Sequence, residues 1–297
     1  MQIKNFKIDK SLKELTKHRT VELPIACYET TINKNINGYI PLHWHEELQF
    51  VFILKGEATF QINEESLNVR EGEGLFINSE CLHMAEDKDH SGCVYLCLNV
   101  SPHFLLPQEL YATYVSPYLR ATNLSYLLLN SDEVWGENIL SAIFTIHQLI
   151  HQKAPYYEMD VSISLTSLWK NLIVNGFKLE YDQVEVQKNK RMKEMLNYVH
   201  SHFAEKLTLD DIAKAGQLSR SECCRYFKRT LKTTPLSYVT DYRIQNSLIL
   251  LQQTELNVTE IAYQVGFNST SYFIDKFRKT TNMTPLAYKK YKLREKG

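Results

Sequence analysis

Two histidines separated by one residue are the first feature of the sequence that suggests chemistry. His43 and His45 fall in a β-rich stretch, where residues two apart point to the same face of a strand. Imidazoles donate and accept hydrogen bonds, and aromatic side chains offer flat faces on which sugar rings stack. The aromatic neighbours are Tyr39, Trp44, Phe50 and Phe52. This pattern predicts a pocket for a small polar ligand, with Trp44 on the opposite face of the strand.

A repeat in the last third of the chain is the second feature. Residues 207–239 parallel residues 256–289. The equivalent pairs are Phe227 with Phe277 and Pro235 with Pro285, 50 positions apart, and Ile212 with Ile261, 49 positions apart. One extra residue is therefore expected in the turn of the second copy. A repeat of this length indicates one supersecondary unit used twice.

Each copy contains the parts of a helix-turn-helix. Small residues, Ala213 and Ala262, stand where two helices must cross closely, and Gly266 can adopt the left-handed conformation of the turn. The candidate N-caps of the second helices are Ser219 and either Asn268 or Ser269. The alternative is a bundle of ordinary amphipathic helices. Two matches at a fixed spacing argue against it.

The net charge of the chain is zero, yet the charges are unevenly distributed. Residues 188–297 carry 20 Lys and Arg against 10 Asp and Glu, whereas residues 1–187 carry 14 against 24. A net charge of +10 on the last third therefore cancels −10 on the rest. Such asymmetry is typical of a nucleic-acid-binding domain joined to a domain without that role.

The second copy resembles a known family. The segment GFNSTSYFIDKFRKTTNMTPLAYKKY, residues 266–291, resembles the signature of AraC/XylS-type transcription regulators. The resemblance covers about residues 188–294 and places residues 235–253 where the family has a linker helix. It implies that each unit lays its second helix in the major groove, on successive turns of one face of double-stranded DNA.

The resemblance also implies which side chains meet the DNA. The first set is Ser219, Arg220, Ser221, Glu222, Cys224 and Arg225, and the second is Ser269, Thr270, Ser271, Asp275 and Lys276. Arg225 is the candidate for a bidentate contact with guanine, and a phosphate contact is its alternative. Asp275 stands where the family often has a basic residue, so we expect a weaker second unit. The expected phosphate contacts are Arg243, Arg278, Lys279, Lys289 and Lys290.

The region around the histidines resembles a second family. The segments GYIPLHWHEELQFVFILKGE and REGEGLFINSECLH, within residues 38–83, resemble a cupin of the kind that precedes this DNA-binding domain in many such regulators. His83 then takes the place of the histidine in the second cupin motif. Cupin enzymes bind a divalent metal with these histidines and a Glu. Here Gln49 takes the Glu position, with Glu46 and Glu47 just before it.

Three interpretations of the histidines follow. A neutral amide replaces a carboxylate ligand poorly, so we expect neither a metal nor another cofactor. We expect an effector pocket formed by His43, His45, Gln49 and His83, for a small molecule such as a sugar. The third interpretation is that the histidines satisfy one another and the backbone inside a packed barrel.

The elements that position these residues follow from the hydrophobic periodicity. Residues 20–106 alternate like β-strands: 48–63 predicts two antiparallel strands around Lys55-Gly56, 66–85 repeats that pattern, and 91–100 adds a strand. Helical periodicity begins at about residue 133. The fold class is therefore α+β multidomain, an N-terminal β-barrel (cupin-like) with following helices and a C-terminal all-α tandem helix-turn-helix. The expected bounds are 1–130 for the barrel, 131–180 for a helical pair, 181–190 for a linker and 191–294 for the DNA-binding domain.

The sequence predicts a transcription regulator rather than an enzyme. An activator that responds to a small molecule, forms a homodimer through the helical pair and contacts RNA polymerase fits best. The absence of a signal peptide, of long apolar runs and of cysteine pairs with metal spacing favours a cytoplasmic protein away from membranes. The alternatives are a cupin metalloenzyme fused to a DNA-binding tail, and a ligand-independent regulator whose barrel only mediates protein contacts.

Overall fold

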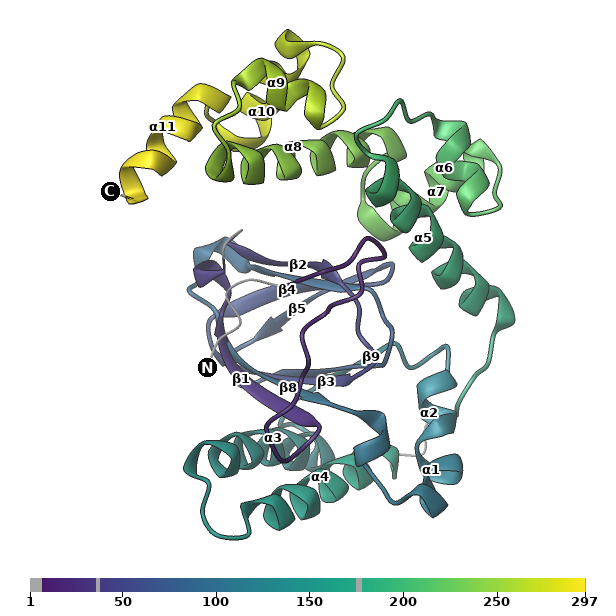
Figure 1. Cartoon of the computed structure of the whole chain (residues 1–297). Coiled ribbons are helices and arrows are strands. Elements are labelled where there is room, and N and C mark those ends of the chain that lie inside the picture. The colour runs from purple at the N-terminus through teal and green to yellow at the C-terminus, as the bar shows by residue number, and fades with distance from the viewer. Residues whose placement is uncertain (1–6, 36–37, 175–177, 297) are drawn as a thin grey trace. The chain divides into compact units, whose positions relative to one another are not determined.

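Two units, residues 1–187 and 188–297, make up the chain, and each is considered by itself. The computed structural model describes residues 7–35, 38–174 and 178–296 (Figure 1). Among these residues, no helix is both long enough and apolar enough to cross a membrane. All six cysteines are free thiols.

Two antiparallel sheets facing each other form the core of the first unit (Figure 1). One sheet has the strand order β1-β8-β3-β6-β9, and the other has the order β2-β7-β4-β5. The strands are β1 (Ile25–Thr31), β2 (Tyr39–His43), β3 (Leu48–Lys55), β4 (Glu57–Ile62), β5 (Glu65–Arg70), β6 (Gly74–Ile77), β7 (His83–Asp87), β8 (Val94–Val100) and β9 (Tyr126–Leu129). The predicted β-barrel is confirmed.

Strand β3, at the centre of the five-stranded sheet, divides the apolar interior in two. Leu48 and Phe50 are buried in a cluster with the helices that follow the barrel, whereas Val51 and Ile53 are buried between the two sheets. Successive residues of a strand point to opposite faces. Gln49 therefore shares the inner face with Val51, and its amide is buried in the barrel.

Helices cover the outer face of the five-stranded sheet (Figure 1). They are α1 (Gln108–Tyr114), α2 (Ser116–Arg120), α3 (Val134–Gln152) and α4 (Tyr157–Ile173). Ile139, Ile143 and Ile146 of α3 are fully buried, because residues three and four apart lie on one face of a helix. Trp169 of α4 joins the same cluster. One face of the helical pair thus packs against the barrel.

The turn at Lys55-Gly56 differs from the sequence prediction. Gly56 has the expected positive φ of 78°, but β3 and β4 are not paired with each other. The chain crosses there from one sheet to the other, and β4 pairs with β5 across a turn that contains Asn63. Two strands joined by a short turn look like a hairpin in the sequence, whereas in a sandwich the chain can cross between the sheets at such a turn.

Helices alone form the second unit. They are α5 (Gln183–His202, which begins in the first unit), α6 (Leu209–Ala215), α7 (Arg220–Leu231), α8 (Pro235–Gln253), α9 (Val258–Gln264), α10 (Thr270–Thr281) and α11 (Pro285–Lys296). The expected linker helix, 235–253, matches α8. The expected linker at 181–190 is mostly helical instead, because α5 begins at Gln183. The other bounds of the sequence-derived domains stay a prediction.

The two helix-turn-helix units, α6–α7 and α9–α10, are built alike. The first helices span 7 residues and the second helices span 12 in both units. Four residues separate α6 from α7, and five separate α9 from α10, which confirms the extra residue. Ser219 and Ser269 are the N-caps of α7 and α10, and Phe227 and Phe277 are fully buried.

One position of the turn distinguishes the two units. Gly266 has a φ of 92°, and a Cβ there would lie 2.6 Å from the carbonyl oxygen of Phe203. Gln217 takes the equivalent position in the first unit, with a φ of 54°. In both turns the next amide bonds back to the first helix, from Leu218 to Ala213 and from Phe267 to Ala262. The backbone is therefore left-handed in both turns, although only one has glycine.

We expect Gln217→Gly to raise the free energy of unfolding of the second unit by about 1 kcal/mol, because glycine removes the left-handed strain. Gly266→Ala should lower it by about 2 kcal/mol or more, because the strain and a close contact add together. Urea unfolding followed by far-UV circular dichroism checks both. Gln217→Ala, which keeps a Cβ, is the matched control and should change little. A loss of stability in Gln217→Gly would contradict this view of the turn.

Candidate ligand-binding cluster and nucleic-acid interface

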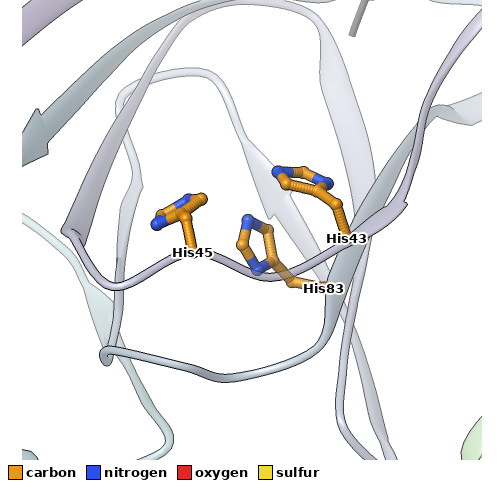
Figure 2. A group of neighbouring side chains, drawn as sticks. All are labelled: His43, His45 and His83. Carbon is orange, nitrogen blue, oxygen red and sulfur yellow. The ribbon is translucent and has the colours of Figure 1, made fainter. Parts of the chain in front are cut away.

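Three histidines meet inside the barrel (Figure 2). His43 ends β2, His83 begins β7, and the pairing of these strands sets the two residues opposite each other. His45 lies two residues beyond His43, and its ring centre is 5.6 Å from that of His43 and 5.0 Å from that of His83. All three side chains are buried. The four-stranded sheet thus gathers the predicted histidines at one place.

Gln49 reaches the histidines from the opposite sheet. Its Oε1 lies 3.1 Å from Nε2 of His45 and 3.2 Å from Nε2 of His83. The structure therefore brings together all four residues that the sequence assigned to an effector pocket. The amide connects the two sheets across the interior of the barrel.

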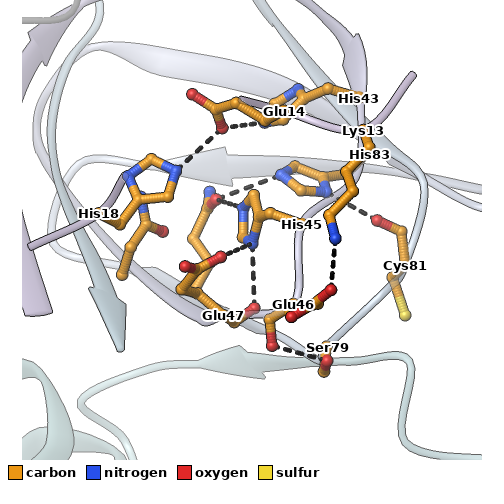
Figure 3. A network of polar contacts seen from close by, with 12 residues as sticks. Lys13, Glu14, His18, His43, His45, Glu46, Glu47, Ser79, Cys81 and His83 are labelled. Carbon is orange, nitrogen blue, oxygen red and sulfur yellow. Dashed lines mark hydrogen bonds and ion pairs between the residues drawn. The ribbon is translucent and has the colours of Figure 1, made fainter. Parts of the chain in front are cut away.

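Two residues that the sequence analysis did not identify complete the cluster (Figure 3). Glu14 and His18 precede β1, and their side chains are buried and joined by a contact of 3.0 Å between Glu14 Oε2 and His18 Nε2. Glu14 Oε2 also lies 3.6 Å from Nε2 of His43. On its other side, His18 Nδ1 accepts a hydrogen bond of 3.0 Å from the amide of Asn99. A carboxylate therefore lies among the histidines.

Burial determines the protonation of the cluster. It lowers the pKa of His43 to about 3, with the nearby His45 adding to the effect. Burial also lowers the pKa of His45, and that of His83 to well below its ordinary value. For Glu14, burial acts to raise the pKa, but the hydrogen bond with His18 and the neighbouring charges together leave it lower than usual. At neutral pH the three imidazoles are uncharged and Glu14 is an anion.

The free space beside these residues is small. A cavity of about 20 Å³, the room that about one water molecule needs, is lined by Glu14, His18, His43 and Gln49, among others. The aromatic residues at its wall are Tyr28 and Tyr95. Tyr39, Phe50 and Phe52 do not line it, and Phe50 and Phe52 pack towards the helices. Trp44, which the sequence placed on the opposite face, does not line it either and donates a hydrogen bond to the carbonyl of Ser11. Strand alternation sends these rings to the other face.

The recognition helix of the first unit, α7, has an exposed basic face. Arg225 is exposed, as are Lys228 and Arg229 further along the helix. Arg220 is also exposed, but it forms an ion pair with Asp210 of α6. Ser219 and Glu222 form a capping box, in which the hydroxyl of Ser219 donates to the carboxylate at 2.7 Å. The two cap residues therefore stabilise the start of the helix, and Arg225 remains the most available candidate for a base.

The recognition helix of the second unit, α10, presents a different surface. Asp275 is exposed and pairs with Lys279 one turn later, at 3.0 Å. Lys276 lies 5.3 Å from the ring centre of Tyr272. Ser271 is exposed, whereas Thr270 is partly buried. The acid thus partly neutralises the basic face of α10. The weaker DNA contact expected of the second unit stays a prediction.

The structure gives two of the expected phosphate contacts another role. Arg243 of α8 is partly buried and donates to the carbonyl oxygens of Phe203 and Glu205, both at 2.7 Å. Burial lowers its pKa. Lys289 donates to the carbonyl oxygens of Thr254 and Leu256. Both cations therefore bind main-chain carbonyl oxygens, whereas Arg278 is exposed and Lys279 is exposed and paired with Asp275.

Comparison with known proteins gives two family matches. Residues 29–125 match an AraC-like ligand binding domain, and residues 212–291 match a helix-turn-helix domain. The chain is 68% identical over 288 residues to the uncharacterized HTH-type transcriptional regulator YdeC of Bacillus subtilis (strain 168), covering 97% of this chain and 99% of that one.

The chain belongs to the AraC family of transcription regulators.

Two more distant AraC-family relatives come from Escherichia coli. The melibiose operon regulatory protein of strain K12 is 24% identical over 257 residues, covering 84% of this chain and 83% of its own. The HTH-type transcriptional activator RhaS of strain E24377A is 25% identical over 259 residues, covering 82% and 86%. The histidine cluster of this AraC-family regulator lies within its ligand-binding domain, whereas Glu14 and His18 precede the matched residues.

Proposed function

We propose that this regulator binds double-stranded DNA with α7 and α10 in the major groove, and that a small ligand in the barrel alters its effect on transcription. The observation that carries the proposal is the repeated pair of capped helices on a unit with a net charge of +10. Basic residues release counterions from DNA phosphates, and a helix fits the major groove. The acidic first unit has a net charge of −10, so DNA phosphates do not attract it. We assign ligand control to this unit.

Activation is the proposed direction of control. One relative is named a transcriptional activator and another a melibiose operon regulatory protein, which favours an activator with a carbohydrate-class effector. An activator works by contact with RNA polymerase, so we include the polymerase among the proposed partners. We also propose that the protein acts in the cytoplasm. A sugar exceeds a cavity of about 20 Å³, so its entry requires side chains that line the cavity to move aside.

A homodimer through α3 and α4 is part of the proposal. The face of these helices away from the barrel has large apolar side chains in contact with solvent. On α4, Met159 and Ile163 are 63% and 66% exposed and lie one turn apart. A second copy of the same face would remove these side chains from water, as in other symmetric dimers.

Arg225→Ala should weaken binding to the operator by about 1–3 kcal/mol and relax the preference at one base pair, if the guanidinium reads guanine. Selection from random duplexes identifies the operator, and fluorescence anisotropy then measures the affinity for each single-base variant. Arg225→Lys keeps the charge without the bidentate donor, so it should lose the preference and keep most of the affinity.

Arg229→Ala, on an exposed arginine one turn further along α7, is the matched control and should lower affinity for all sequences alike. Equal behaviour of Arg225→Ala and Arg229→Ala would show that Arg225 contacts phosphate. No loss of affinity in either variant would contradict the placement of α7 in the groove.

Ligand control has a separate test. A ligand that binds the folded barrel at 100 times its dissociation constant stabilises it by about 2.7 kcal/mol, so the melting temperature must rise. We expect at least one compound of a broad carbohydrate library to produce such a rise in the wild-type protein and not in Gln49→Ala. Silence across the library would leave the barrel with a purely structural or protein-contact role.

A further inference from the structure

Helix α5 packs against the first helix-turn-helix, α6–α7. Gly216, which ends α6, lies so close to α5 that a Cβ at this position would be 2.7 Å from Cγ of Met195. Met195, Leu196 and Val199 of α5 are fully buried. Close packing of this kind leaves little room for one element to move without the other. The end of α5 and the first helix-turn-helix therefore form one body.

The turn that follows α5 contacts the second helix-turn-helix, α9–α10. The ring of Phe203 packs against the apolar core of that helix-turn-helix, and its centre lies 5.2 Å from that of Tyr242 of α8. Gly266 approaches the same turn from the other side. A Cβ on Gly266 would lie 2.6 Å from the carbonyl oxygen of Phe203 and 2.9 Å from Cα of Ala204. The two helix-turn-helix units therefore touch directly, as well as being joined through α8.

Arg243 of α8 contacts both sides of this junction. Its Nε donates to the carbonyl oxygen of Phe203 and its Nη2 to that of Glu205, both at 2.7 Å. The centre of its guanidinium lies 5.8 Å from the ring centre of Phe267, in the turn of the second helix-turn-helix. A guanidinium is planar with donors in fixed directions, so two such bonds also fix its orientation. Arg243 thus bridges the segment that leads into α6 and the turn that leads into α10.

An aromatic stack holds the end of α5 on α8. The buried ring of His200 stacks on Tyr242, with ring centres 4.0 Å apart and an angle of 16° between the planes. Nε2 of His200 also lies 2.7 Å from the hydroxyl oxygen of Tyr238. A movement of α5 along α8 would break both the stack and this hydrogen bond. Arg243, which follows Tyr242, therefore acts at a place where α5 is already fixed.

We propose that Arg243 is a positioning residue that fixes the separation and the rotation between the recognition helices α7 and α10, so that the regulator selects operators by the spacing of their two half-sites. A half-site here is the set of base pairs read by α7 or by α10 of one chain. This inference rests on the proposed function, in which both helices occupy the major groove.

The helical geometry of DNA makes spacing a strict requirement for a rigid pair of helices. One added base pair moves a half-site by about 3.4 Å along the axis and by about 35° around it. A rigid pair that is placed on one half-site is then displaced from the other and loses its base contacts there. A pair that can move loses less. The loss of affinity on insertion therefore reports how tightly the junction holds the two helices.

Operators of altered spacing test the proposal. The reference duplex is the operator obtained by selection, and the Arg225 variants locate the base pairs that α7 reads. A second duplex has one base pair inserted between the half-sites, and a third has one removed. Fluorescence anisotropy measures the affinity of the full-length protein for each duplex. We expect the wild-type protein to bind the altered duplexes at least about 10-fold more weakly, about the effect of one mismatched base pair.

Arg243→Gln removes the bridge between the carbonyl oxygens and the turn. It should bind the reference operator more weakly than the wild type does, because the two helices are less well preorganised. The spacing penalty, the ratio of the affinities for the reference and altered duplexes, should be at least about three-fold smaller, a coupling expected within one network of contacts. Arg243→Lys keeps the charge without the two-donor fork, so it should restore part of the penalty.

Arg278→Gln is the matched control, because it also removes one positive charge, from an exposed arginine of α10. It should weaken binding to all three duplexes by the same factor and keep the wild-type spacing penalty. The same uniform loss in Arg243→Gln would make Arg243 a phosphate contact and would overturn the proposal.

Hydrogen exchange of the DNA-free protein keeps this inference apart from the proposed function. The amides of Gly266 and Phe267, which bond back to α9, should exchange faster in Arg243→Gln than in the wild type, whereas those of α7 should not change. Unchanged exchange in that turn, or faster exchange with an unchanged spacing penalty, would contradict the positioning role. Faster exchange in a protein that binds no duplex would refute the proposed function and still support the junction. Circular dichroism verifies folding, and Arg243→Lys takes the place of Arg243→Gln if the latter unfolds.

Discussion

The alternation of β3 is the constraint on which the first unit depends. Phe50, on one face of this strand, packs against α3 and α4. Gln49 and Val51, on the other face, point into the barrel. A shift of one residue would place a polar amide against the helices and aromatic rings in the cavity. The polar cluster exists because this register holds Gln49 opposite His45 and His83. The same register excludes the neighbouring aromatic residues from the cavity.

The second unit depends on local geometry rather than on long-range register. Its two turns share a left-handed residue and the same backbone hydrogen bond to the preceding alanine, so the angle between the helices is set within about twenty residues. Arg243 then joins α8 to the segment after α5 through two backbone carbonyls. The exposed basic residues Arg225, Lys228 and Arg229 of α7 are available to contact DNA. On α10, Asp275 pairs with Lys279 and neutralises part of the positive charge. The two units are alike in backbone and unlike in surface.

The sequence was sufficient for the two helix-turn-helix units and for α8 because their signals are local, whereas it predicted a linker where α5 begins. Caps, a glycine turn and Thr-Pro pairs lie within a few residues of the elements they define, and helix α8 appears at its expected bounds. The strand pairing of the barrel was harder to predict, since a short turn at Gly56 does not reveal that the chain crosses from one sheet to the other. Glu14 could not be found, because it lies 29 positions before His43 in a polar stretch without periodicity. Only the fold brings it to the histidines.

DNA binding by this regulator depends on the separation of charge between the two units, and the salt dependence of operator binding measures that most directly. The full-length protein and its operator are titrated at several salt concentrations, and the logarithm of the binding constant is plotted against that of the salt concentration. Six or more phosphate contacts require a slope of about −5 or steeper. We predict such a slope for the wild-type protein. A slope near zero would show that the basic second unit does not lie along the phosphates, and would contradict the account.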